Sequence, residues 1–296
     1  MVTNDEMLRM FDDLDAINHE VTKESILRAP FPYPGGKSRS VKYILEYLPH
    51  SKIYVEPFGG SAAVMLSKPR CELDVFNDRY SGVVSFYRCM RNKEKVDRLM
   101  EMIDLSIHSR EDFIKFRNTW EDVNDDVDRA FRWYYTMSYS FGSLGRNFGR
   151  STNSNSMAGK IRNNLYLFPK IHERFKKIQV ENQDWHNCMV DYDGPDTVFY
   201  VDPPYIDGDQ HIYKNTMKRD EHYKLLDVIF NLEGFVAVSG YSNPIYENQK
   251  WDYRREWNSF VSIQSMAYAE GNNKKELKGL EKRRSAKEVL WIKDAK

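Results

Sequence analysis

The sequence predicts an α/β fold in which a doubly wound parallel sheet is interrupted by a mostly helical segment. A short apolar run, Ile53–Val55, ends at Glu56-Pro57 and leads through a glycine-rich turn into a helical pattern, as in a βαβ unit. Further runs typical of buried strands recur at 178–180, 198–201, 235–238 and 289–292. Between these two groups of strands, helical spacing dominates from about Lys93 to Tyr139.

The elements divide the chain into a core and two additions. Residues 1–29 form an acidic, partly helical extension, 30–87 and 176–296 the core, and 88–175 an inserted helical lobe. In the first part of the core we expect a glycine-rich loop, a helix near 41–48, a strand at 71–76 and a helix at 80–90. The polar stretch 142–164 is too long for a simple connection, so it is a candidate functional loop.

Composition excludes several classes of protein. Of 296 residues, 41% are hydrophobic and 30% charged, which is typical of a globular chain and not of a disordered one. No apolar run approaches the ~18 residues that span a bilayer, and no signal peptide is visible, so we expect a soluble, cytoplasmic protein. The three cysteines are scattered and have no neighbouring histidines in ligand spacing, which predicts no metal site.

The charge is unevenly distributed although its sum is zero. Residues 1–28 hold seven acids and three bases, a net charge of −4, whereas residues 141–180 hold eight bases and one acid, a net charge of +7. The second segment could meet phosphates. A solvated basic helix explains the same charge equally well.

Asp202-Pro203-Pro204-Tyr205 follows directly on the apolar strand 197–201. Two prolines cannot continue a central strand, so the chain leaves the sheet there and holds a carboxylate and an aromatic ring at the strand's carboxyl end, where α/β sheets bind ligands. A carboxylate and a proline-fixed carbonyl can accept protons from a weakly nucleophilic exocyclic amine, and the tyrosine can stack on a flipped base. An ordinary strand-ending turn is the alternative.

A glycine turn and an acidic residue form a candidate ligand site at the first βαβ unit. In Glu56-Pro57-Phe58-Gly59-Gly60-Ser61, glycines let the backbone approach a ligand at a helix N-terminus. Asp78 lies 22 residues beyond Glu56, where an acid can bind ribose hydroxyls. Helix capping is the simpler role for Asp78.

Pro34-Gly35-Gly36-Lys37-Ser38 resembles a phosphate-binding loop only superficially. A Walker A loop needs a glycine at position 31, which is Phe31, and no strand precedes the segment. A glycine loop that presents Lys37 to a carboxylate fits better.

Taken in order, these motifs resemble the D12 class of N6-adenine DNA methyltransferases, over roughly residues 30–292. Tyr33-Pro34-Gly35-Gly36-Lys37 is similar to the family's GGK motif, and Glu56-Pro57-Phe58-Gly59-Gly60 to its glycine motif. Asn77-Asp78 resembles the ribose-binding segment, which favours Asp78 over Asp74, and Asn182-Gln183-Asp184-Trp185 the segment beside the cofactor's adenine. The tetrapeptide 202–205 matches the catalytic motif.

The resemblance implies a Rossmann-like sheet, S-adenosylmethionine as cofactor and double-stranded DNA as partner, in a bacterial or phage-infected cell. It implies direct methyl transfer to adenine N6 without a metal, with Asp202, Pro203, Pro204 and Tyr205 at the catalytic centre. A cognate restriction endonuclease is a possible partner. The implied cofactor-binding residues are Tyr33, Gly35, Gly36, Lys37, Glu56, Pro57, Phe58, Gly59, Gly60, Asp78, Asp184 and Asp202.

The motif order is that of the family's α group, which implies that the lobe at 88–175 recognises the DNA target. Its sequence echoes the family only loosely, so GATC specificity does not carry over. Our candidates for DNA contact are Arg146, Arg150, Lys160 and Arg162, more readily with phosphates than with bases. The aromatic residues Tyr139, Phe141 and Phe148 fit core packing better than base stacking.

Two other functions stay open. N4-cytosine methylation uses similar chemistry on another exocyclic amine. A catalytically inactive nucleic-acid-binding homologue could keep the fold, although we would expect it to have lost one of Lys37, Asp78 and Asp202.

Overall fold

The structure is a computed structural model that describes residues 27–150, 159, 161–206, 217–260 and 285–296. Nearly all of the acidic extension predicted at 1–29 and the candidate DNA contact Lys160 lie outside the described residues. None of the described helices is long and apolar enough to span a membrane.

Seven strands of the described chain form one sheet in the order β3-β2-β1-β4-β5-β7-β6. They are β1 (Ile53–Glu56), β2 (Leu73–Asn77), β3 (Gln179–Glu181), β4 (Thr197–Val201), β5 (Phe235–Tyr241), β6 (Tyr253–Phe260) and β7 (Ser285–Lys293). The first five are parallel, whereas β7 runs antiparallel to both β5 and β6. The sheet is therefore doubly wound, and its strand order reverses between β1 and β4, where such sheets bind ligands.

Helices precede and follow the strands as the βαβ pattern predicts. In the core they are α2 (Val41–Leu45), α3 (Ala63–Ser67), α10 (Trp185–Asp191), α11 (Arg219–Asn231) and α12 (Pro244–Glu247). Between β2 and β3 lie α4 (Ser81–Met90), α5 (Lys93–Leu105), α6 (Arg110–Thr119), α7 (Asp126–Tyr139), α9 (Phe168–Phe175) and the 3-10 helices η1 (Phe141–Ser143) and η2 (Arg162–Leu167).

Alternating side chains of the strands feed two hydrophobic cores, one on each face of the sheet. On β1, Tyr54 belongs to the core shared with α2, α3, α4 and α7, and Val55 to the core shared with α10, α11 and α12. Both side chains are fully buried. Burial on both faces explains why the parallel strands read as continuous apolar runs in the sequence.

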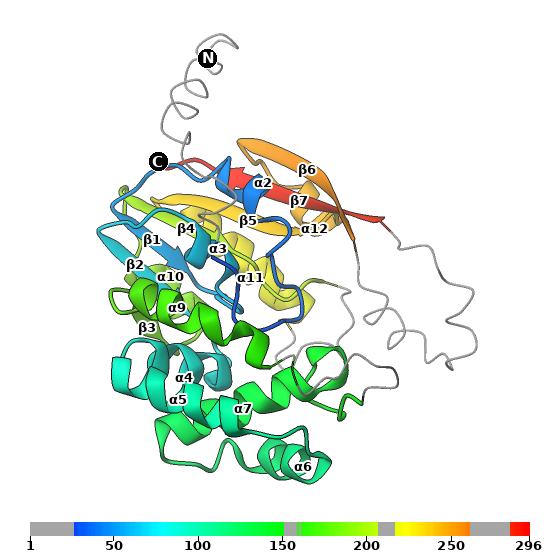
Figure 1. Cartoon of the computed structure of the whole chain (residues 1–296). Helices are drawn as coiled ribbons and strands as arrows, with labels where there is room; N and C mark the ends of the chain where they lie inside the picture. The colour runs from blue at the N-terminus through cyan, green and yellow to red at the C-terminus, as the bar shows by residue number, and fades with distance from the viewer. Residues whose placement is uncertain (1–26, 151–158, 160, 207–216, 261–284) are drawn as a thin grey trace, which may run out of the picture.

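The helices between β2 and β3 gather at the end of the sheet that β3 forms, far from β6 and β7 (Figure 1), and α9 among them packs against β2. Their core is continuous with that of the sheet, since Phe86 of α4 and Phe168 and Phe175 of α9 pack in the same cluster as Phe76 of β2. The predicted boundaries of the inserted lobe, 88 and 175, stay a prediction.

A buried ionic cluster ties α9 to the sheet. Arg174 Nη1 lies 2.6 Å from Asp74 Oδ2 on β2, and Lys68 Nζ, directly after α3, lies 3.1 Å from Asp74 Oδ1. Arg174 Nε also donates to the Met65 carbonyl at 3.1 Å. All three charged side chains are less than one-tenth exposed. The net positive charge of 141–180 therefore overstates the charge at the surface.

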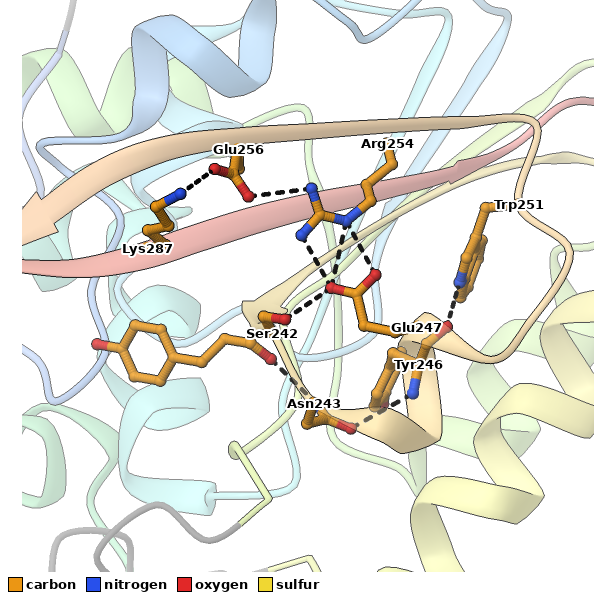
Figure 2. A network of polar contacts seen from close by, with 9 residues as sticks. Ser242, Asn243, Tyr246, Glu247, Trp251, Arg254, Glu256 and Lys287 are labelled. Carbon is orange, nitrogen blue, oxygen red and sulfur yellow. Dashed lines mark hydrogen bonds and ion pairs between the residues drawn. The ribbon is translucent and has the colours of Figure 1, made fainter.

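The β6–β7 hairpin is fastened to α12 by a network of polar side chains (Figure 2). Glu247 of α12 accepts from Arg254 Nε at 2.9 Å, and Arg254 Nη1 also lies 3.0 Å from Glu256. Lys287 of β7 pairs with Glu256, and the Trp251 indole donates to the Tyr246 carbonyl at 2.7 Å. The network holds the hairpin against the segment that follows β5.

The predicted α/β class and the βαβ units are confirmed. Strand β6 was not predicted, because its residues Tyr253 to Asn258 include three consecutive charged side chains and no apolar run. As the edge strand it faces solvent, where charged residues are typical.

Candidate functional site

A cavity of about 420 Å³ opens at the carboxyl ends of β1, β2 and β4. It is lined from the sheet side by residues 33–37, 56–61, 78–80, 185, 200 and 202–204, and from the helical side by 117, 118, 120, 133, 136, 137 and 144–146. The motifs that begin at Tyr33 and at Asp202, 169 residues apart in sequence, thus share one cavity. Its position is the switch point of the sheet.

The turn after β1 needs glycine at two places. A Cβ on Gly59 would lie 2.2 Å from the Phe76 ring, and Gly60 has φ +49°, in the left-handed region. The contact with Phe76 leaves no room for a side chain at Gly59, and glycine adopts the angle of Gly60 with the least strain, so these glycines bring the main chain to the cavity wall. The predicted residues Glu56, Pro57 and Phe58 line the same wall.

Glu56 is buried at the bottom of this turn. The Tyr54 hydroxyl donates to Glu56 Oε1 at 2.8 Å. Burial raises the pKa of Glu56 to about 8, against the influence of the Tyr54 hydrogen bond and of Lys68. Glu56 can therefore hold a proton at neutral pH and donate it as well as accept.

Asp78 lies in the cavity wall after β2, held by two backbone donors. The Gly60 N–H donates to Oδ2 at 2.8 Å and the Tyr80 N–H donates to Oδ1 at 2.7 Å. Burial raises the pKa of Asp78 to about 6. Each oxygen keeps a lone pair for a further donor. The fully buried Asn77 joins this loop to its neighbours, since its amide donates to the Pro57 and Gln183 carbonyls at 2.9 and 3.2 Å.

Asp202 follows β4 and is held from two sides. Lys37 Nζ donates to Oδ2 at 2.6 Å, and Ser239 Oγ, on the adjacent strand β5, donates to Oδ1 at 2.8 Å. Burial raises the pKa of Asp202, and the ammonium of Lys37 opposes this shift. Pro203 and Pro204 line the cavity beside it. The carboxylate is thus fixed in orientation at the cavity wall.

Lys37 is 4% exposed, and its ammonium is used inside the protein. Besides Asp202, it donates to the Gly35 carbonyl at 2.8 Å and lies 3.5 Å from Glu288 Oε1. Lys37 thus contacts carboxylates of the chain itself, and its predicted role in cofactor binding stays a prediction. Tyr33, Gly35 and Gly36 of the same loop line the cavity.

Tyr205 faces a small hollow beside the main cavity, together with Ser239, Gly240 and Tyr241. Its hydroxyl donates to Glu288 Oε1 at 3.0 Å, and its ring meets the Tyr241 ring edge-on at 4.7 Å. Base stacking by Tyr205 stays a prediction.

Asp184 caps α10, because its Oδ1 accepts from the His186 N–H at 3.0 Å. Its side chain is 43% exposed and lies 3.8 Å from Arg79. Trp185, the next residue in the chain, lines the cavity and stacks on Phe58 with ring centroids 6.1 Å apart. A cofactor role for Asp184 stays a prediction.

The candidate DNA contacts occupy different environments. Arg146 lines the cavity, and its carbonyl accepts from Arg117 at 2.7 Å, whereas Arg150 is exposed. Arg162 donates to the carbonyls of Asp104 and Ser106 at 2.8 and 2.5 Å, which ties η2 to the end of α5.

Of the three aromatic candidates, two pack inside the lobe. Tyr139 is fully buried, and Phe148 stacks on His108 with ring centroids 4.5 Å apart. Phe141 is 44% exposed.

Three residues of this site had no role assigned from the sequence. Ser239 follows one apolar run and Glu288 precedes another, so a polar residue next to an apolar run was the available signal. Arg117 lies in an ordinary amphipathic helix and gave none. Among the described residues, no cluster of three histidine, cysteine or acidic side chains could hold a metal ion.

Comparison with known proteins gives two findings. The profile of the D12 class N6 adenine-specific DNA methyltransferase family matches residues 33–270. The proteins named DNA adenine methylase from Escherichia coli K12 and from Escherichia coli O157:H7 are each 25% identical to the chain over 183 residues, which cover 60% of this chain. The match spans 65% of the length of these relatives, a little under two thirds. The family match covers most of the chain's length and includes all of the cavity motifs, so the chain belongs to the D12 class of N6 adenine-specific DNA methyltransferases.

Proposed function

We propose that the chain transfers a methyl group from S-adenosylmethionine to the N6 amino group of adenine in double-stranded DNA. The observation that carries this proposal is the fixed carboxylate of Asp202, held by Lys37 and Ser239 at the wall of a cavity that also contains the glycine turn and Asp78. The family assignment and the relatives named DNA adenine methylase support adenine and DNA as the target.

The residues of the cavity fit the cofactor. A volume of about 420 Å³ falls within the range of about 300–1,000 Å³ typical of small-molecule sites. A Cβ on Gly60 would lie 3.2 Å from the Tyr33 ring, and both residues line the cavity. Glu56 and Asp78 offer acceptors for an amine and for ribose hydroxyls, and Phe58 and Trp185 offer an apolar wall for an aromatic ring. When bound, the cofactor supplies an electrophilic methyl group on a sulfonium.

The chain's own residues orient the amine. The Asp202 carboxylate and the Pro203 carbonyl accept hydrogen bonds from the amino group, which localises the nitrogen lone pair for attack on the methyl carbon. The positive charge that would develop on nitrogen during methyl transfer would lie beside the Asp202 carboxylate, which can accept the proton that the methylated amine releases. Lys37 and Ser239 hold that carboxylate in place throughout.

We propose that the helices between β2 and β3 face the DNA. Arg117 of α6 and Arg146, in the loop after η1, line the cavity, and Arg150 is exposed nearby in sequence. Arg146 and Arg150 therefore suit DNA contact better than Arg162, whose guanidinium binds backbone carbonyls.

Incubation with radiolabelled S-adenosylmethionine and mixed-sequence duplex DNA, followed by digestion to nucleosides, tests the proposal. We expect label in N6-methyladenine, lost in Asp202→Ala. Asp196→Ala is a matched control, because Asp196 precedes the opposite end of β4 and pairs with Lys52 at the surface. Label in cytosine, or no label despite DNA binding, would refute the proposal.

A further inference from the structure

Glu288 is a buried carboxylate beside residues 202–205 after β4, here called the catalytic turn. It is 4% exposed and stands on β7 immediately before the apolar run Val289–Ile292. A carboxylate is buried at a large free-energy cost unless donors satisfy it, so its partners indicate its purpose. Glu288 is not one of the described residues that line the main cavity. Any influence on the cavity must therefore pass through other side chains.

Three donors converge on Glu288 from two distant segments. The Tyr205 hydroxyl donates to Oε1 at 3.0 Å, and Lys37 Nζ lies 3.5 Å from the same oxygen. The Ser40 hydroxyl donates to Oε2 at 2.7 Å. Glu288 therefore joins the glycine loop and the catalytic turn to strand β7.

The hairpin secures this arrangement from the far side of Ser40. Trp257 of β6, paired in register with Glu288, donates its indole N–H to Ser40 Oγ at 3.2 Å. The Trp257 ring also stacks on Tyr43 with centroids 5.6 Å apart. Ser40 thus contacts both strands, since it accepts from Trp257 of β6 and donates to Oε2 of Glu288 on β7. The other carboxylate oxygen, Oε1, is left for Tyr205 and Lys37.

We propose that Glu288 is a positioning residue for methyl transfer, which fixes the Tyr205 ring and the Lys37–Asp202 pair relative to each other. This inference rests on the proposed function. The ring of Tyr205 is held at its hydroxyl by Glu288 and at its edge by Tyr241. Lys37 Nζ lies 5.0 Å from the centre of that ring and 2.6 Å from Asp202. One carboxylate thus sets both the ring and the ammonium that orients Asp202.

The test compares Glu288→Leu, Glu288→Gln and the control Glu256→Gln. Glu256 lies on β6 of the same hairpin, paired with Arg254 and Lys287 at the surface (Figure 2). Loss of a hydrogen bond to a charged group lowers a rate or equilibrium constant that depends on it about tenfold to hundredfold. Glu288→Leu should therefore lower kcat by about tenfold to hundredfold. Glu288→Gln should recover part of kcat, because the amide oxygen still accepts from Tyr205. The affinity for S-adenosylhomocysteine should change less than about threefold in all three variants.

A double-mutant cycle with Tyr205→Phe adds a reading that a purely structural role would not give. If Glu288 acts through Tyr205, the Tyr205→Phe change should cost less kcat in the Glu288→Leu background than in the unaltered chain. Tyrosine-ring NMR supplies a reading without turnover: the Tyr205 resonance, assigned by its loss in Tyr205→Phe, should shift in Glu288→Leu.

The outcomes separate this inference from the proposed function. If the unaltered chain methylates DNA and both Glu288 variants keep kcat within about twofold, Glu288 does not position the site. A loss of kcat that only follows a loss of folded protein overturns the inference too, and the near-isosteric Glu288→Gln guards against that confusion. If the unaltered chain transfers no methyl group, the proposed function fails, and an unchanged Tyr205 resonance then overturns the positioning role on its own.

Discussion

Replacing Arg174 by methionine should destabilise the chain strongly, because it leaves Asp74 buried with half of its compensation. Arg174 Nη1 lies 2.6 Å from Asp74, and the two side chains are 8% and 4% exposed. Breaking a buried pair costs about 3–5 kcal/mol. Since Lys68 still lies 3.1 Å from Asp74, we expect the lower end, about 3 kcal/mol. The replacement also removes the hydrogen bond to the Met65 carbonyl.

Urea unfolding followed by tryptophan fluorescence measures this loss. Lys176→Met is the matched control, because Lys176 directly follows the same helix and pairs with Glu173 at the surface, where such pairs contribute about 0–1 kcal/mol. Adding Asp74→Asn to Arg174→Met should lower stability further, since the buried Lys68 then loses its acidic partner. The reasoning fails if Arg174→Met lies within about 1 kcal/mol of the unaltered chain or of Lys176→Met.

Three further expectations concern pH, the glycine turn and DNA. Burial raises the pKa of Glu56 from 4.5 to about 8, so between these pH values the folded chain keeps a proton that the unfolded chain has released. The free energy of unfolding should therefore fall as the pH rises from 4.5 to about 8. In urea unfolding measured across this pH range, Glu56→Gln should show a smaller fall. Gly59→Ala places a Cβ 2.2 Å from an aromatic ring and should cost about 1–3 kcal/mol and weaken cofactor binding in calorimetry, whereas Gly194→Ala, with its nearest contact at 4.0 Å, should change neither. Arg150→Ala should lower the salt dependence of DNA binding by about one unit of slope, while Arg162→Ala should lower the melting temperature and leave that slope unchanged; the reverse pattern in salt titrations would contradict the assignment.

The sequence predicted the sheet and the cavity motifs because both depend on local signals. Parallel strands buried on two faces are apolar along most of their length, so 198–201 and 235–238 stand out against polar surroundings. The glycine turn is equally legible, since the contact of Gly59 with Phe76 permits no side chain. The order of the motifs then placed them at one end of the sheet, and they line one cavity.

Contacts between distant segments could not be read in the same way. Arg174 counted as part of a basic surface, yet a partner 100 positions earlier buries it. The partner of Lys37 was expected to be a carboxylate, but the sequence alone did not say that Asp202 supplies it. Strand β6 carries charges because it is an edge strand, and only pairing with β7 shows it to be a strand.

The position of β7 has a consequence for how the chain folds. Among the described strands β7 comes last in sequence, yet it pairs with β5 on one side and β6 on the other. Before it inserts, the edge of β5 is an open template on which another chain can pair. The same insertion brings Glu288 beneath Tyr205. If Glu288 positions the site as we propose, closure of the sheet by β7 also completes the site.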